Sequence, residues 1–364
     1  MQESVASLRK DMRFEGFLMV RNSSTRVSNA TGKPYIDMTL ADKTGEINCK
    51  VWDHVRYNDR KLDENTVPPA AGSVVKVRGP VQEYNGRLQL RVEVMRDAAE
   101  NDDVEMGLLV KCAPEKPEAM LAEIEEAVEE MTWEDLKKIL KAMLGRAGKK
   151  LMYYPAAQRL HHAERSGLLH HTLSMLRIAR NVAPLYPFLN RDLLFAGVIA
   201  HDLGKIGEMQ ADETGSVGDY TTEGLLLGHL VDGVAAVREC ARDVGVEGEA
   251  VLLLSHMIIS HHGVPEFGSP RAPMFPEAEA LHMIDDLDAK LNEMESVMER
   301  TPAGVFSEKI WSLDRRLYHP RYPGDETEAP AEEPASAPAP GERPLPGRDA
   351  GGTVPGRGSY DGLL

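Results

Sequence analysis

The sequence contains little that would tie it to an oxidising compartment or to a membrane. Its only three cysteines, Cys49, Cys112 and Cys240, lie far apart and form neither a CxxC motif nor a disulfide framework. The first residues include no apolar segment of the kind that a secretory signal needs, and no run of 18 apolar residues predicts a membrane helix. We therefore expect a cytoplasmic protein without a membrane partner.

Aromatic residues make up only 5% of the 364 residues, and acidic residues outnumber basic ones, so that the net charge is −16. This balance excludes a uniformly basic nucleic-acid-binding protein. The charge is uneven, however. Residues 13–97 contain 14 Lys and Arg against 11 Asp and Glu, a local charge of +3, which leaves −19 for the rest of the chain. A mildly basic module on an acidic body can still bind a polyanion.

Residues 13–97 contain five short runs, several of which alternate apolar and polar residues as β-strands do. The runs are FEGFLMV, PYIDMTLAD, GEINCKVWD, SVVKVRGPVQEY and RLQLRVEVM. Asn85-Gly86 predicts a hairpin between the last two runs, and the insert 56–71 separates the third from the fourth. Five strands with a long third connection predict an all-β OB-fold barrel over 1–97, with another small β-barrel as the alternative.

The rest of the chain has a different character. Residues 98–150 begin as an acidic linker and continue as connecting helices, the second of which has Thr132 as its expected N-cap. Residues 151–320 are expected to be helical throughout. From 321 to 364 the chain is rich in proline and glycine and has almost no large apolar residues, which predicts a disordered tail. The fold class is therefore multidomain, with an all-α domain after the β-barrel.

Histidine is concentrated in one region, because ten of the twelve histidines lie between His161 and His282. The gaps between the key members are 24 to 32 residues, about one helix and a connection each. Imidazole and carboxylate suit first-row divalent metals, and the lack of thiolate ligands argues against a structural zinc site. The sequence therefore predicts a metal site that serves hydrolysis. Its candidate ligands are His171, His201, Asp202, His229, His261, His262 and Asp285.

The string HDLGK at 201–205 is the most specific in the chain. It follows the apolar run 193–200, for which a buried helix is favoured over a buried strand, so both ligands lie at the end of that helix. Gly204 permits the turn that lets neighbouring side chains bind one metal. Lys205 places a cation beside an anionic substrate, and Asp202 and Lys205 are the candidate catalytic residues. A buried histidine beside a helix-capping aspartate is the structural alternative.

Residues 150–295 resemble the HD-domain phosphohydrolase superfamily. The resemblance rests on the strings HHAERSGLLHHTLSML, AGVIAHDLGKI, LLGHL, IISHHG and LHMIDDLDAK. With the β domain in front of them, residues 10–300 are similar to the YhaM family of 3′-to-5′ exoribonucleases, which have an OB-fold before the HD domain. The resemblance implies metal-dependent hydrolysis of single-stranded RNA, with DNA as a further substrate, from the 3′ end.

The resemblance also implies roles for the ligands. His171 would be the first histidine ligand, and His201 and Asp202 would be the paired ligands. Asp285 would be the closing aspartate, with Asp288 as its alternative, since the family pattern carries two aspartates three residues apart.

His229 and His261 match the added histidines that let some HD domains hold a second metal, and His262 would be a ligand or a phosphate contact. The family metal is Mn²⁺, with Fe²⁺, Co²⁺ and Ni²⁺ as alternatives. Two ions are expected, bridged by Asp202 because a carboxylate has two oxygens to share. The metals would activate water for attack on phosphorus, and Lys205 would add positive charge at a non-bridging oxygen.

Other histidines have several interpretations. His162 is a candidate substrate contact, directly after His161. His170 stands where relatives often have an acidic residue and is either a spare ligand or a polar surface residue. His256 is expected in the core or on the surface, and His282 is either a hydrogen-bond partner of a ligand or unrelated to the site.

Single-strand binding is expected from the β domain. Candidates for base stacking are Tyr35, Trp52 and Tyr84, and candidates for phosphate contacts are Lys33, Lys50 and Arg87. The alternative is that these aromatic residues fill the core of the barrel and that the charges only solvate a surface.

Two other functions remain open at this point. The first is an HD phosphohydrolase of nucleotides or cyclic dinucleotides, which has little need for a domain that grips single strands. The second is a non-catalytic RNA-binding protein with a decayed metal site, against which the intact ligand series argues. A homo-oligomer is left open.

Overall fold

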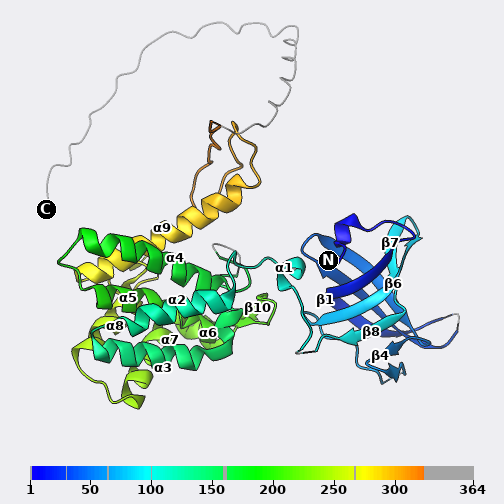
Figure 1. Cartoon of the computed structure of the whole chain (residues 1–364), viewed down its shortest axis with the longest axis horizontal. Coiled ribbons are helices and arrows are strands. Elements are labelled where there is room, and N and C mark those ends of the chain that lie inside the picture. Colours follow the sequence, from blue (N-terminus) through cyan, green and yellow to red (C-terminus); the bar gives the residue numbers. More distant parts are fainter. Residues whose placement is uncertain are drawn as a thin grey trace, which may run out of the picture.

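The computed structural model describes residues 2–29, 31–63, 65–99, 101–158, 162–265 and 268–323. In this part of the chain a β domain precedes a helical domain, and the short helix α1 (Met106–Leu109) lies between them (Figure 1). The predicted tail lies outside the described residues from 324 onward. No helix among the described residues has the length and apolar character that crossing a bilayer requires.

Five main strands build the β domain. They are β1 (Arg13–Val27), β2 (Pro34–Asp42), β3 (Gly45–Trp52), β6 (Val74–Tyr84) and β7 (Arg87–Arg91). Their pairing runs β1-β2-β3-β7-β6 and returns to β1, with β3 and β7 parallel and the other neighbours antiparallel. A five-stranded Greek-key arrangement of this kind is the OB-fold that the sequence predicts.

The strands differ from the expected runs in detail. β1 has 15 residues, and the long insert contains a small hairpin of β4 (Arg56–Tyr57) and β5 (Arg60–Lys61). The fifth run divides into β7 and β8 (Val94–Asp97), which pair with different halves of β6. Gly79 lies at this division. A Cβ on Gly79 would be 1.9 Å from the Arg91 carbonyl oxygen, so only glycine lets the chain pass.

The helical domain is a bundle around one apolar helix. Its helices are α2 (Pro117–Glu129), α3 (Glu134–Ala147), α4 (Gly167–Val182), α5 (Arg191–Ala200), α6 (Lys205–Glu208), α7 (Thr222–Asp243), α8 (Glu249–Ser260) and α9 (Pro276–Met298). This domain also contains the 3₁₀ segments η2 (Gly148–Met152) and η3 (Ala183–Leu185), while a third, η1 (Val5–Ser7), precedes β1 in the β domain. Every residue of α5 after Arg191 is buried, which confirms the buried helix.

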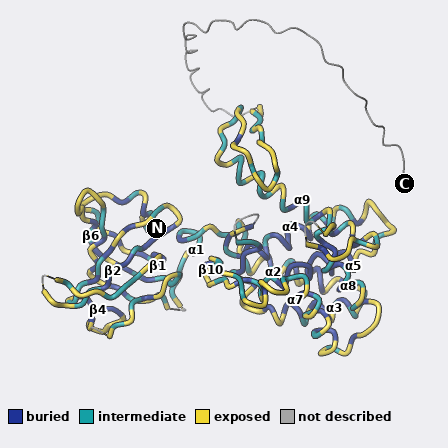
Figure 2. Tube along the Cα trace, turned by 180° about the vertical axis from the view of Figure 1, so that it is seen from behind, coloured by how far each residue is buried: buried dark blue, intermediate teal, exposed yellow. Residues whose placement is uncertain are grey.

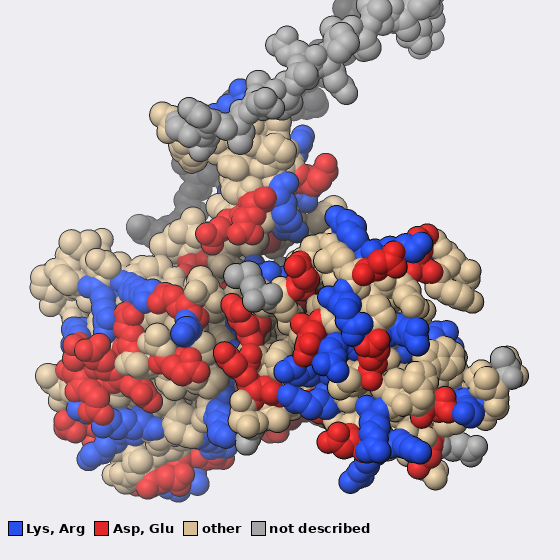
Figure 3. Space-filling model, turned by 45° about the vertical axis from the view of Figure 1, so that its right-hand side comes forward, with Lys and Arg blue, Asp and Glu red and all other residues tan. Residues whose placement is uncertain are grey.

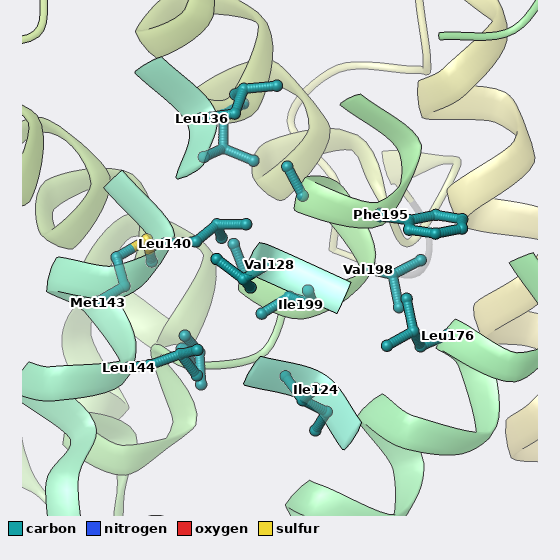
Figure 4. Packing of buried hydrophobic residues seen from close by; sticks show 14 of the residues in the cluster. Ile124, Val128, Leu136, Leu140, Met143, Leu144, Leu176, Phe195, Val198 and Ile199 are labelled. Atoms are coloured by element: carbon teal, nitrogen blue, oxygen red, sulfur yellow. The ribbon is translucent and has the colours of Figure 1, made fainter. Parts of the chain in front are cut away.

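The predicted connecting helices belong to the core of the helical domain. Figure 4 shows Phe195, Val198 and Ile199 of α5 among side chains of α2, α3 and α4, and all of these lie in one hydrophobic cluster. The expected cap of α3 was wrong, because the N-cap position is Trp133. Thr132 instead donates to the Asp192 carboxylate of α5, from its amide at 2.7 Å and from its hydroxyl at 2.8 Å.

Helix is not continuous through 151–320 as expected. A hairpin of β9 (Met209–Ala211) and β10 (Val217–Tyr220) follows α6. After α9, residues 301–323 form turns and isolated bridges and project from the bundle (Figure 1). Figure 2 shows that buried residues are concentrated inside the two domains and are rare along this projection.

Candidate metal centre

The predicted ligands converge on Asp202, which follows the C-terminal end of α5. Asp202 Oδ1 lies 3.5 Å from His229 Nε2 and 3.7 Å from His261 Nε2. Asp202 Oδ2 lies 3.4 Å from His201 Nε2 and 3.8 Å from His171 Nε2. Four helix segments distant in sequence thus present one imidazole each to the same carboxylate.

The remaining candidates complete this centre. Asp285 on α9 places Oδ1 3.2 Å from His171 Nε2, and the Lys205 ammonium lies 2.7 Å from Asp202 Oδ2. His262 has a donor atom within 4.8 Å of donor atoms of His229 and His261. The structure therefore brings all seven predicted metal ligands into overlapping groups at one place.

Two glycines allow the close approach of α7. Gly228 has φ 73° and ψ 163°, which breaks the helix directly before His229 and redirects the chain there. Gly204 has an ordinary helical φ of −61°, so the turn after Asp202 does not require glycine. Its role differs from the expected one, because a Cβ at Gly204 would lie 2.3 Å from the His229 carbonyl oxygen.

Each of the four imidazoles is oriented by a contact at Nδ1, on the side away from Asp202. His201 Nδ1 lies 2.8 Å from the carbonyl oxygen of Val198, and His261 Nδ1 lies 2.7 Å from that of Ile258. A ring nitrogen that donates to a carbonyl leaves the lone pair on the other nitrogen, so Nε2 of both rings is available to a metal.

Carboxylates orient the other two imidazoles. His171 Nδ1 lies 2.7 Å from Asp288 Oδ2, and His229 Nδ1 lies 3.1 Å from Glu208 Oε2. Asp288, the alternative closing aspartate, therefore lies behind His171. Glu208 was missed by the sequence analysis, and its position in α6, three residues after Lys205, carries no signal by itself.

Several buried polar atoms of this centre have no hydrogen-bond partner among the described residues. They are His201 Nε2, Asp202 Oδ1, His229 Nε2 and His262 Nδ1. A buried polar atom left unpaired costs about 1–3 kcal/mol. A divalent cation would satisfy all of them together, and a mixed imidazole and carboxylate set suits first-row metals. The residues present therefore fit a metal ion.

The pKa shifts hold His261 and Asp202 in the form that binds a metal, whereas the shift of His171 favours its protonated form. Burial lowers the pKa of His261 well below its usual value, which keeps this imidazole neutral as a ligand must be. Burial would raise the pKa of Asp202, but Lys205 and His201 outweigh burial and hold it well below the usual range. Burial also opposes charge on His171, yet its hydrogen bonds to Asp285 and Asp288 raise its pKa to about 9.

A second polar cluster lies behind Asp288. The His162 side chain is buried, with Nε2 2.9 Å from Asp288 Oδ2 and Nδ1 3.1 Å from His170 Nδ1. His170 Nδ1 is also 3.1 Å from Glu164 Oε1. The predicted substrate contact His162 is thus placed behind His171, on the far side of Asp288, and His170 is neither among the residues around Asp202 nor free on the surface. His161 lies outside the described residues.

The two remaining histidines lie away from the Nε2 cluster. His256 Nε2 accepts a hydrogen bond from the Met274 amide at 3.1 Å. His282 Nδ1 lies 2.8 Å from the carbonyl oxygen of His261, so it supports the backbone of the loop that carries His261.

The candidate nucleic-acid residues gather on the outward face of the β domain. Tyr35 and Trp52 are direct neighbours across β2 and β3, with ring centroids 5.0 Å apart and an interplanar angle of 29°. Lys50 Nζ lies 5.3 Å and 6.0 Å from the two ring centroids. Lys33 pairs with Asp53 at 2.6 Å. Neither aromatic ring fills the core, because both residues are only partly buried.

The rest of this face is polar. Arg87 is exposed at the start of β7, and Tyr84 is 65% exposed beside it in the same hairpin. Figure 3 shows basic and acidic side chains interspersed over both domains, so charge alone does not mark a binding track in that view.

Comparison with known proteins assigns the family. A model of the HD domain matches residues 168–290, and a model of OB-fold nucleic acid binding domains matches residues 18–98. The 3′-5′ exoribonuclease YhaM of Bacillus licheniformis is 40% identical over 303 residues, which cover 83% of this chain and 93% of the relative. This chain belongs to the YhaM family.

A second YhaM relative, from Listeria innocua, is 40% identical over 309 residues, which cover 85% of this chain and 95% of the relative. Among solved structures, a domain of replication protein A from Methanococcus maripaludis matches 27% of this chain and 94% of its own, with 19% identity and a TM-score of 0.21. In this YhaM-family chain, the HD match contains all seven centre residues, and the OB-fold match contains the Tyr35–Trp52 pair.

Proposed function

We propose that this YhaM-family chain is a metal-dependent phosphodiesterase that shortens single-stranded RNA from its 3′ end. One observation carries the proposal: four imidazoles, each oriented through Nδ1, turn Nε2 toward one buried carboxylate whose Oδ1 lacks a hydrogen-bond partner among the described residues. The named activity of the relatives supports the choice of RNA and of the 3′ end.

The proposed ligands are the seven residues of the centre, namely His171, His201, Asp202, His229, His261, His262 and Asp285. When bound, a divalent ion supplies a nucleophile from water at neutral pH and stabilises the charge that develops on the phosphoryl oxygens. Seven ligand side chains exceed what one six-coordinate ion accepts, which supports two ions. We propose Mn²⁺ as the metal.

Lys205 provides the positive charge for the substrate. Burial opposes the charge on Lys205, but the Asp202 carboxylate outweighs burial and raises the pKa of this lysine, so its ammonium stays protonated at neutral pH. We propose that it donates a hydrogen bond to a non-bridging phosphoryl oxygen as negative charge develops there. Asp202 and Lys205 are thus the proposed catalytic residues.

The β domain holds the strand upstream of the reacting end. The stacked rings of Tyr35 and Trp52 offer a platform for bases, and Lys50, Lys33 and Arg87 surround it with positive charge. The β2–β3 face and the β6–β7 hairpin are the parts of an OB-fold that bind oligonucleotides. We propose that residues 1–97 bind the strand and that residues 151–320, with α2 and α3 packed into the same core, form the catalytic domain.

Labelled strands test the proposal. With Mn²⁺, a 5′-labelled single-stranded RNA should shorten stepwise from its 3′ end, a chelator should stop the reaction, and a base-paired region should stall it. A DNA strand of the same sequence measures the preference for RNA. Efficient cutting of a circular single strand would mean an endonuclease. Hydrolysis of cyclic dinucleotides with intact RNA strands would replace the substrate class altogether.

A further inference from the structure

A charged cavity lies where the two domains meet. Its volume is about 430 Å³, within the usual range for small-molecule sites. The β domain contributes β1 and the β2–β3 turn, and the helical domain contributes the segments after α1 and before α4 together with the β9–β10 turn. The two sides are in contact, because a Cβ added at Gly72 of the β domain would lie 2.5 Å from Asp212 Oδ2 in the β9–β10 turn.

The lining of this interdomain cavity includes four cations, Arg21, Lys43, Lys111 and Arg165, and two carboxylates, Asp42 and Glu164. Both carboxylates already have partners. Asp42 accepts hydrogen bonds from the amides of Val5 and Thr44, each at 2.7 Å. Glu164 lies 3.3 Å from Lys111 and 3.1 Å from His170. The cavity therefore has an excess of positive charge.

Two of the cations are not used in ion pairs. Among the described residues, neither Lys43 nor Arg165 has a carboxylate oxygen within 4.0 Å. Arg165 donates from Nε to the Glu213 carbonyl oxygen at 2.9 Å, which orients the guanidinium without neutralising it. Burial raises the pKa of the Cys112 thiol, and the charges of Arg165 and Lys43 both oppose that rise. Cations from the two domains thus lie close enough together to influence the same thiol.

The cavity lies between the Tyr35–Trp52 pair of the β domain and the residues around Asp202 in the helical domain. On the β-domain side, the outward face of β2 and β3 begins at the Tyr35–Trp52 pair and ends at the turn that carries Lys43. Eight residue steps at about 3.3 Å each give a path of about 26 Å. On the helical side, Glu164 is joined to His171 of the metal centre through His170, His162 and Asp288.

We propose that the interdomain cavity binds the phosphodiester backbone of the single strand between the aromatic platform and the metal centre, through Lys43 and Arg165. The inference rests on the proposed function. It also sets the polarity of the strand. The 5′ part lies on Tyr35 and Trp52, the backbone crosses the cavity, and the 3′ end enters the helical domain.

Binding measurements with matched variants test this site. The test variant is Lys43→Gln/Arg165→Gln, which removes two positive charges and leaves both backbones in place. The control variant is Lys138→Glu on an exposed position of α3, which changes the net charge by the same amount away from the cavity. Fluorescence anisotropy with a 5′-labelled RNA longer than about 16 nucleotides, the upper site size of one OB-fold, is measured in chelator at several salt concentrations.

The test variant should bind the strand at least about tenfold more weakly at low salt. Its logarithmic salt slope should fall by about 1.4, since each lost phosphate contact removes about 0.7 on a single strand. The control should keep the slope of the wild type. If the double variant unfolds, Lys43→Gln alone should remove about half of the slope change, because that side chain is exposed.

The outcomes separate this inference from the function on which it rests. The double variant could fold and bind RNA with the same affinity and salt slope as the wild type. This result would overturn the proposal that the cavity binds the phosphodiester backbone, and it would leave the exonuclease proposal intact. Failure of the wild type to bind or hydrolyse any single strand would count against the proposed function itself.

Discussion

In the β domain the proposed functional side chains point outward and satisfy one another, whereas in the helical domain they point inward and leave polar atoms unpaired. Tyr35 and Trp52 stack on each other, and Lys33 pairs with Asp53, all at the surface. His201 and Asp202 are buried, yet His201 Nε2 and Asp202 Oδ1 have no partner among the described residues. Side chains on an outward face can bind a ligand from solution without rearrangement. Buried polar atoms without partners are unfavourable, and a bound ion would satisfy them.

The comparison also explains which interactions should matter most. Groups on the β face are hydrated when no strand is bound, so each contributes modestly to the affinity for the strand. The loss of one group should therefore weaken binding without abolishing it. Groups in the helical centre act as a unit around Asp202, so that the loss of one disturbs the others. Four predictions, from the largest expected effect to the smallest, test this contrast.

Asp202→Asn should lower RNA hydrolysis by about a thousandfold or more, because the substitution removes the charge shared by four imidazoles and a metal supplies several kcal/mol of transition-state stabilisation. Hydrolysis rates and elemental analysis measure the loss of activity and of bound metal. Asp286→Asn, a half-buried α9 carboxylate paired with Lys290, is the matched control and should change neither. Full activity of Asp202→Asn in a strong chelator would end the metal hypothesis.

Asp288→Asn should weaken metal binding about 10- to 100-fold, because a carboxylate behind a histidine ligand fixes the ring and raises its basicity. The carboxylate contacts His171 Nδ1 at 2.7 Å and His162 Nε2 at 2.9 Å. A Mn²⁺ titration followed by electron paramagnetic resonance measures the affinity. A loss as complete as that of Asp202→Asn would instead place Asp288 on the metal.

Trp52→Ala should weaken binding of a long single strand by about tenfold, since stacking on one aromatic residue contributes about 1–3 kcal/mol. The ring also supports Tyr35 and the Lys50 ammonium, so part of the loss comes from a disordered platform. Trp311→Ala is the control, because Trp311 is 83% exposed and has its own lysine, with Lys309 Nζ 4.8 Å from the ring centroid. Equal losses in both variants would show a nonspecific effect of surface tryptophan.

The smallest effect concerns pH. The pKa of His171 is raised to about 9 in the folded protein without metal, above its value near 6.5 in the unfolded chain. The stability that this group adds is therefore complete below about pH 6.5 and is lost as pH rises toward 9. Thermal melts in chelator should show a falling Tm over this window. Mn²⁺ affinity should rise over the same window, because the ion displaces the proton. A Tm in chelator that rises from pH 6.5 to 9 would contradict the first part.

Much of the helical centre could be predicted because metal ligands are rare residue types whose order along the chain reflects one helix per ligand. His171, His201, Asp202, His229 and Asp285 were all predictable from residue type and order along the chain. The supporting residues were not. Glu208 is an ordinary glutamate in sequence, and only the kink at Gly228 brings His229 to it.

In the β domain, too, local features could be predicted from the sequence and contacts between distant segments could not. Alternation and the Asn85-Gly86 turn predict five strands and their order along the chain, because each of these signals is local in the sequence. The division of the last run into β7 and β8 depends on the passage of Arg91 over Gly79, a contact between strands that no local pattern contains.

By itself, the sequence determined the two domain types, the order of the strands along the chain and the identity of the residues that gather around Asp202, because these depend on residue chemistry and on periodicity along the chain. Only the tertiary structure decided which position each of two neighbouring side chains takes in the centre. Asp285 and Asp288 are three residues apart and share a helix face. Asp285 lies at His171 Nε2, on the side of Asp202, and Asp288 lies at His171 Nδ1, and this difference depends on the rotation of α9 against α4. That rotation is set by packing between helices distant in sequence, and the same packing places His162 behind the centre rather than in it.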